Sequence, residues 1–116
     1  MSFNTELVKR LKQGSVKNVK LFGDSMGQSK IPYLTIKPIA GGDRELLQII
    51  VHMDLGTQDL LKKYLLMELT ALLKRPIEYD GNSVTVRSTG AWLGPYADEG
   101  DNSLAMSRDF YIPVII

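Results

Sequence analysis

LLQIIVHMD, at residues 46–54, and TQDLLKKYLLMELTALLKR, at residues 57–75, are the two segments that decide the fold. The first is apolar at nearly every position, which is typical of a central strand buried on both faces. The second has Thr57 as a candidate capping residue, and Pro76 directly follows its basic last turn. Together they predict a buried strand followed by a long helix.

The helix expected at 57–75 has a broad apolar face. Its apolar positions cover a wide arc, with polar residues on the opposite side. They are Leu60, Leu61, Tyr64, Leu65, Met67, Leu69, Leu72 and Leu73. The strand at 46–54 is apolar on both faces, and the helix can bury its apolar arc only against another apolar surface. We therefore expect the helix to pack across one face of the sheet.

The remaining segments predict a short N-terminal helix, capped by Asn4, and several more strands. Asp80-Gly81-Asn82 is a strong hairpin signal, since Gly and Asn tolerate positive φ. Strands are expected at 16–22, 33–39, 77–79, 83–87 and 105–116. The fold class that follows is α/β of the α+β type. We expect a single domain, 1–116, with a mixed or antiparallel sheet of about five to six strands, a short N-terminal helix and one long covering helix.

Residues 88–104 have no periodicity and contain three glycines, which predicts a long loop. The loop has three large apolar residues, Trp92, Leu93 and Tyr96, and three acidic residues, Asp98, Glu99 and Asp101. Trp and Tyr are favoured as anchors in protein interfaces. The alternative is that they fold back as a lid on the domain's own core. We expect the loop to be exposed or poorly ordered in the isolated protein and to become ordered at a protein contact.

Composition narrows the class of protein. The chain has no cysteine, which excludes disulfides and thiolate metal sites. Its apolar runs are too short to cross a bilayer, and the N-terminus lacks the features of a signal peptide. We therefore expect a soluble protein that stays inside the cell that makes it.

The net charge is only +1, but it is unevenly placed. Residues 1–38 have seven basic and two acidic residues, whereas residues 39–116 have seven basic and eleven acidic ones. Lys9, Arg10 and Lys12 lie in the basic part and are candidate contacts for the acidic loop of a neighbouring copy. The same lysines could instead contact nucleic acid, or simply be solvated.

No catalytic, cofactor-binding or metal-binding constellation is evident in the sequence. The single histidine, His52, lies inside the most apolar strand and is interpreted as a hydrogen-bonded core residue. No serine lies in a Gly-x-Ser-x-Gly motif, and Gly23–Gly27 lacks the Gly-Lys-Ser/Thr ending of a phosphate loop. We therefore expect a protein that is not an enzyme and has no cofactor.

The order of the expected elements resembles that of the tail terminator, or tail completion, proteins of long-tailed bacteriophages and related prophages. Three segments carry the resemblance: Pro32–Lys37, Gln48–His52 before Gly56, and Ser107–Ile112. The resemblance implies a viral structural protein of the head-tail joining region, located in the virion tail and assembled in the host cytoplasm. It implies a ring homo-oligomer, commonly a hexamer, whose partners are the tail tube protein and the head-tail connector protein. It implies no small-molecule substrate and no membrane.

Two other functions stay open at this point. One is a small nucleic-acid-binding module that uses the basic N-terminal region, with Lys17 and Lys20 beside the residues named above. The other is a metal-dependent enzyme whose acidic loop, together with Asp109, holds a divalent cation.

Overall fold

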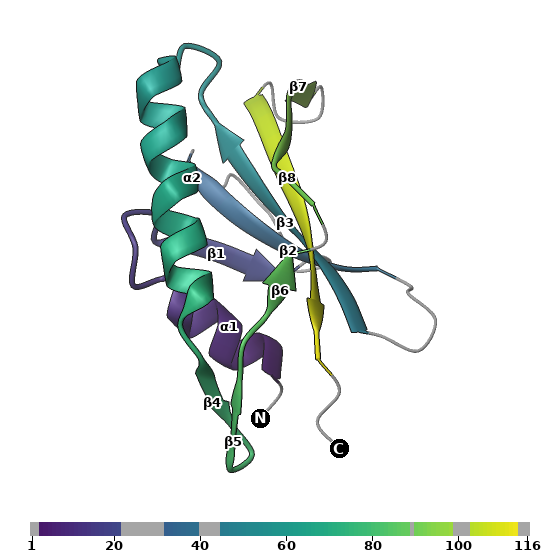
Figure 1. Ribbon diagram of the computed structural model, residues 1–116. Helices are drawn as coiled ribbons and strands as arrows, with labels where there is room; N and C mark the ends of the chain where they lie inside the picture. The colour runs from purple at the N-terminus through teal and green to yellow at the C-terminus, as the bar shows by residue number, and fades with distance from the viewer. Residues whose placement is uncertain (1–2, 22–31, 40–44, 89, 99–102, 114–116) are drawn as a thin grey trace.

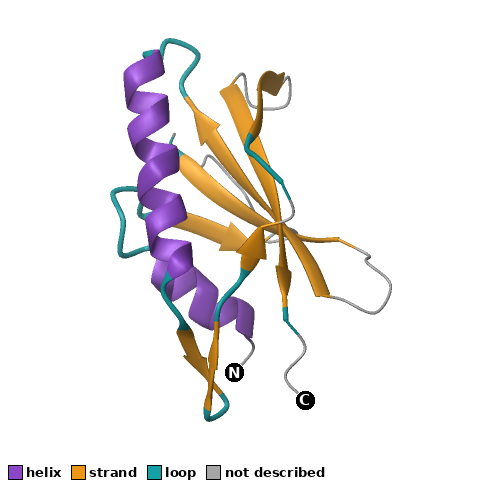
Figure 2. Cartoon of the chain, viewed as in Figure 1, coloured by secondary structure: helices purple, strands orange, loops and turns teal. Residues whose placement is uncertain are grey.

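The computed structural model describes residues 3–21, 32–39, 45–88, 90–98 and 103–113. Within them are two helices, α1 (Phe3–Leu11) and α2 (Asp59–Lys74). The strands are β1 (Asn18–Leu21), β2 (Tyr33–Ile39), β3 (Glu45–Met53), β4 (Ile77–Tyr79), β5 (Asn82–Val84), β6 (Arg87–Ser88), β7 (Leu93–Asp98) and β8 (Ser103–Ile112). Figure 1 shows both helices on the same side of the sheet, and Figure 2 shows the β4–β5 hairpin extending from one end of the molecule. The predicted α+β fold, with a short N-terminal helix and a long second helix, is confirmed.

The main sheet has the strand order β1-β2-β3-β8-β6, and β7 also pairs with β8. The β1–β2 pair is parallel and all the other pairs of this sheet are antiparallel, so the sheet is mixed. β3 lies between β2 and β8, which confirms the central position predicted from its apolar sequence.

The core lies between the sheet and the helices. Alternate residues of β3 are buried in it, from Leu47 to Met53, as the two-residue period of a strand requires. Leu7 and Leu11 of α1 and Leu69 of α2 are fully buried against them. Each such leucine stabilises the fold by about 1.5–3 kcal/mol relative to an exposed one.

Both expected helix caps are wrong by one or two residues. α1 includes Phe3, so Asn4 lies inside the helix. The Phe3 ring packs edge-on against Tyr79, with 5.8 Å between the ring centroids. α2 begins at Asp59, and its N-cap is Gln58, which makes no side-chain cap hydrogen bond. Thr57 is instead part of the preceding turn, because its N–H donates to the carbonyl of Asp54 at 3.0 Å.

The predicted loop at 88–104 is wrong for residues 93–98, which form β7 and pair with β8, and at its two ends, where residue 88 belongs to β6 and residues 103 and 104 belong to β8. The alternation of apolar and polar residues that usually marks a strand is absent in β7, because its pairing register with β8 shifts between Leu93 and Tyr96. Gly94 has φ of 113°, and a Cβ there would lie 2.8 Å from the carbonyl oxygen of Ala105. Pro95 has no N–H to donate to a ladder. Because a glycine and a proline lie at this bulge, the sequence of the edge strand β7 resembles that of a loop.

Candidate interaction surface

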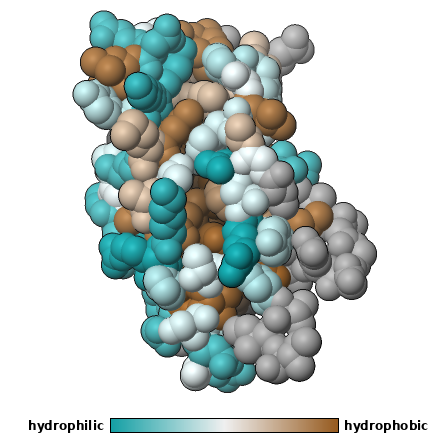
Figure 3. All heavy atoms as spheres, viewed as in Figure 1, coloured by the Kyte–Doolittle hydropathy of each residue, from teal (hydrophilic) through white to brown (hydrophobic). Residues whose placement is uncertain are grey.

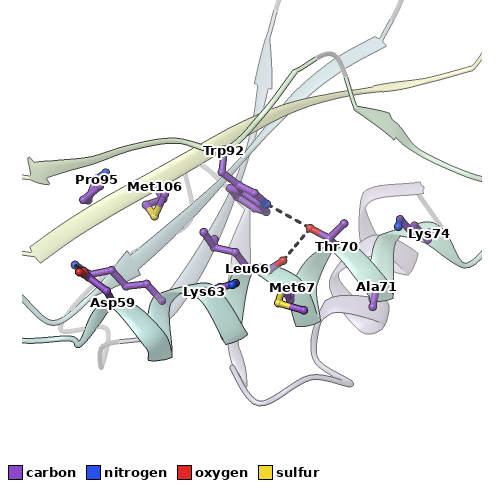
Figure 4. Close-up of a pocket in the computed structure, with 11 residues that line it drawn as sticks. Asp59, Lys63, Leu66, Met67, Thr70, Ala71, Lys74, Trp92, Pro95 and Met106 are labelled. Atoms are coloured by element: carbon purple, nitrogen blue, oxygen red, sulfur yellow. Dashed lines mark hydrogen bonds and ion pairs between the residues drawn. The ribbon is translucent and has the colours of Figure 1, made fainter.

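A groove of about 620 Å³ lies between α2 and the segment around β7. Its lining is mostly apolar, with three lysines and one aspartate. The lining residues are Asp59, Lys62, Lys63, Leu66, Met67, Thr70, Ala71, Lys74, Trp92, Pro95 and Met106. Figure 4 shows Trp92 directed from the sheet side toward Thr70 on α2, with Leu66 beside it. The groove is therefore built by two parts of the chain, and the β4–β5 hairpin lies between them in the sequence.

Trp92 is a wall of this groove and is held from two sides. Its Nε1–H donates to Oγ1 of Thr70 at 3.3 Å, and the hydroxyl of Thr70 donates to the carbonyl of Leu66 at 2.8 Å. The indole ring meets Phe110 edge-on, with 6.3 Å between ring centroids. Trp92 is half-buried against the core, which fits the alternative in which this residue folds back on its own domain.

Arg108 fixes the segment that precedes β7. Its Nε donates to Oγ of Ser88 at 2.6 Å and to the carbonyl of Gly90 at 2.8 Å. Its guanidinium carbon lies 6.0 Å from the centroid of the Trp92 ring and 5.7 Å from that of Phe110. These cation–π contacts hold the indole in its place over the sheet.

Six large apolar side chains of α2 and β7 are exposed, four on the helix and two on the strand, and we call the four on α2 the apolar strip. Leu93 and Tyr96 of β7 pair with Ser107 and Ala105, which places them on the face of the sheet away from α2. The exposed fractions are 58% for Leu60, Leu61 and Tyr64, 56% for Met67, 60% for Leu93 and 45% for Tyr96. Figure 3 shows apolar residues at the surface among polar ones on this side of the molecule. Contiguous apolar patches larger than a few hundred Å² are rare on monomeric soluble proteins and mark interaction sites.

The expected exposure of Leu93 and Tyr96 therefore agrees with the structure, although both lie on a strand and not on a loop. Of the acidic residues predicted beside them, Asp98 ends β7, whereas Glu99 and Asp101 lie outside the described residues.

Arg10 has a structural role that the sequence did not indicate. Its guanidinium donates to the carbonyls of Leu72 at 3.1 Å, Arg75 at 2.7 Å and Pro76 at 2.8 Å. The carbonyls of Leu72 and Arg75 lie at the C-terminal end of α2, where they lack partners within the helix and carry the negative end of its dipole, and Pro76 follows the helix. Burial, and then the charge of Arg75, lower the pKa of Arg10, but an arginine stays charged at neutral pH. Arg10 thus joins the two helices.

The other residues of the basic N-terminal region differ from Arg10. Lys9 forms an exposed ion pair with Glu6 at 3.4 Å. Lys12 is exposed, and its carbonyl accepts a hydrogen bond from Nζ of Lys17 at 3.1 Å. Arg10 is therefore held at the end of α2, whereas Lys9 and Lys12, three residues apart, remain exposed.

His52 is buried, as expected, but it lies on the face of the sheet opposite to Val51 and Met53 of the core. It is 7% exposed, and its ring stacks on Tyr33 with 4.1 Å between centroids. Its Nε2 lies 3.3 Å from Oγ1 of Thr35. Asp109, a candidate cation ligand by its sequence, accepts a hydrogen bond from Gln48 Nε2 at 3.2 Å. Among the residues that the structure describes, no three His, Cys, Asp or Glu side chains are grouped closely enough to hold a metal ion.

No helix within the described ranges is long and apolar enough to span a membrane.

Comparison with known proteins identifies the fold but no activity. No family model and no curated protein matches the chain. Eight chains of solved structures match it. One of them superposes with a TM-score of 0.62 at 19% sequence identity, covering 98% of this chain and 92% of its own, and its name states no function. Identity at this level shows a shared fold alone.

Proposed function

We propose that this chain is a structural protein of a phage or prophage tail. It forms a ring that terminates the tail tube and joins it to the head-side connector. Its partners are further copies of itself, the tail tube protein and the head-tail connector protein, and its place is the virion tail. The resemblance of Pro32–Lys37, Gln48–His52 and Ser107–Ile112 to tail terminator proteins supports the proposal.

The apolar strip is the observation that carries the proposal. A chain that assembles needs apolar surface that is exposed before assembly and covered after it. Leu60, Tyr64 and Met67 recur on α2 at spacings of four and three residues, which places them in one row on the helix surface. Leu93 and Tyr96 of β7 are also exposed, on the face of the sheet away from α2.

The experiment that tests the proposal is electron microscopy of the purified chain, alone and mixed with polymerised tail tube protein. We expect closed rings, and we expect tubes that carry a ring at one end and stop growing when the chain is present. A chain that stays monomeric at every concentration, and leaves tube length unchanged, would refute the proposal.

A further inference from the structure

We propose that the groove between α2 and β7 of one copy receives the β4–β5 hairpin of a second copy. This inference rests on the proposed function, since it specifies the contact by which the ring closes. The groove is the receiving surface because it is a mostly apolar hollow beside the exposed Met67 of α2, and three lysines line it.

Charge identifies the hairpin as the occupant. The hairpin tip has Glu78 and Asp80, both exposed, and these residues line an acidic hollow with Glu6 and Tyr79. Lys62 and Lys63 line the groove near the start of α2, where Asp59 is the one acidic lining residue. Opposite charges on two surfaces steer them together and disfavour wrong registers.

The hairpin has a defined shape before it binds. Asp80 and Gly81 have φ of 51° and 76°, as a two-residue turn between twisted strands requires. The side-chain amide of Asn82 donates to the carbonyl of Asp80 at 3.2 Å, and Ser83 donates to the carboxylate of Glu78. A preformed element loses little conformational entropy on docking, so more of the contact energy remains as affinity.

A symmetric contact between the two α2 helices fits less well. Antiparallel pairing around Tyr64 would place the exposed Lys63 of each copy at the edge of the contact, and like charges across a contact are unfavourable. The hairpin and the start of α2 lie toward opposite ends of the molecule (Figure 1). Contact between two different surfaces is heterologous, and such contacts form rings when the rotation closes.

The test is a charge exchange between two variants. The groove variant is Lys62→Glu with Lys63→Glu, and the hairpin variant is Glu78→Lys with Asp80→Lys. Each should assemble poorly alone, with the dissociation constant raised at least about tenfold, because groove and hairpin then have the same charge. Their mixture should restore assembly, since every groove then meets a hairpin of opposite charge. Lys12→Glu, a reversal on an exposed residue away from the groove, should assemble like the parent chain.

Oligomeric state is measured by sedimentation velocity, and a thermal melt of each variant verifies folding. If the groove variant does not fold, Lys63→Glu alone replaces it, since Lys63 is exposed and Lys62 forms an ion pair with Asp59 at 3.2 Å. Assembly of either variant like the parent, or a mixture that stays dissociated, overturns the inference. Dissociation by Lys12→Glu alone also overturns it. In these cases rings of the parent chain would still support the proposed function, whereas a monomeric parent chain would refute both.

Discussion

The two halves of α2 are equally apolar in sequence but differ in the structure. In the C-terminal half, Leu69 and Leu73 are 0% and 2% exposed. In the N-terminal half, Leu61 and Tyr64 are each 58% exposed. The difference follows from α1, which packs on α2, and whose Arg10 bonds the carbonyl of Leu72. In the N-terminal half only Leu65 and Leu66 pack against the core, whereas Leu60, Leu61 and Tyr64 stay exposed.

The largest expected effect separates these halves by stability. Leu69→Ala should lower the free energy of unfolding by about 2–5 kcal/mol, because it leaves a cavity in the core. Leu61→Ala should change it by no more than about 0.5 kcal/mol, since that side chain is already exposed to water. Urea denaturation of the two variants measures both values. Equal losses of unfolding free energy would show that the two halves of α2 contribute equally to the core.

A second, smaller effect compares two neighbours at β7. Trp92→Ala should cost about 1–3 kcal/mol, because it removes a half-buried ring and the hydrogen bond to Thr70. Leu93→Ala should leave the melting temperature nearly unchanged and weaken assembly instead. Thermal melts beside sedimentation profiles separate the two outcomes. If Trp92→Ala weakened assembly without lowering the melting temperature, Trp92 would be an interface anchor and not a support of the domain's own core.

The smallest expected effect concerns the link between the helices. Arg10→Met should cost about 1 kcal/mol, since it removes three partly exposed hydrogen bonds at the end of α2. Lys12→Met is the matched control and should be close to neutral. Chemical denaturation of both variants at low and high salt is the measurement. A loss at Lys12 as large as that at Arg10 would remove the distinction between them.

Periodicity was sufficient to predict most of the fold. The apolar run at 46–54 and the strand-like segment at 33–39 place β3 and β2 correctly. Burial differs from the pattern, because Leu46, Gln48 and Ile50 of β3 are only half-buried, whereas all four residues from Tyr33 to Ile36 are buried. The turn at Asp80-Gly81 also predicts the hairpin correctly. β7 was missed because its bulge at Gly94 and Pro95 breaks the period on which the prediction relies.

The interaction surface was only partly predictable. The exposed positions of Leu93 and Tyr96 follow from their place in an aperiodic segment, although the expected loop is a strand. The sequence pattern does not separate the exposed row on α2 from the other apolar positions of the helix, all of which are expected to face the sheet. The only sign of an exposed row is the width of the apolar arc, since one sheet face cannot cover eight apolar positions. The role of Arg10 depends on a contact between residues 62 to 66 positions apart, which no local pattern encodes.

Tyr64→Asp tests most directly the proposal that the N-terminal half of α2 is a self-association surface. Sedimentation equilibrium of the parent chain and of this variant, over a range of concentrations, is the measurement. We predict a closed oligomer for the parent chain and a folded monomer, with an unchanged melting temperature, for Tyr64→Asp. A parent chain that is monomeric throughout, or a variant that assembles as well as the parent, would contradict it.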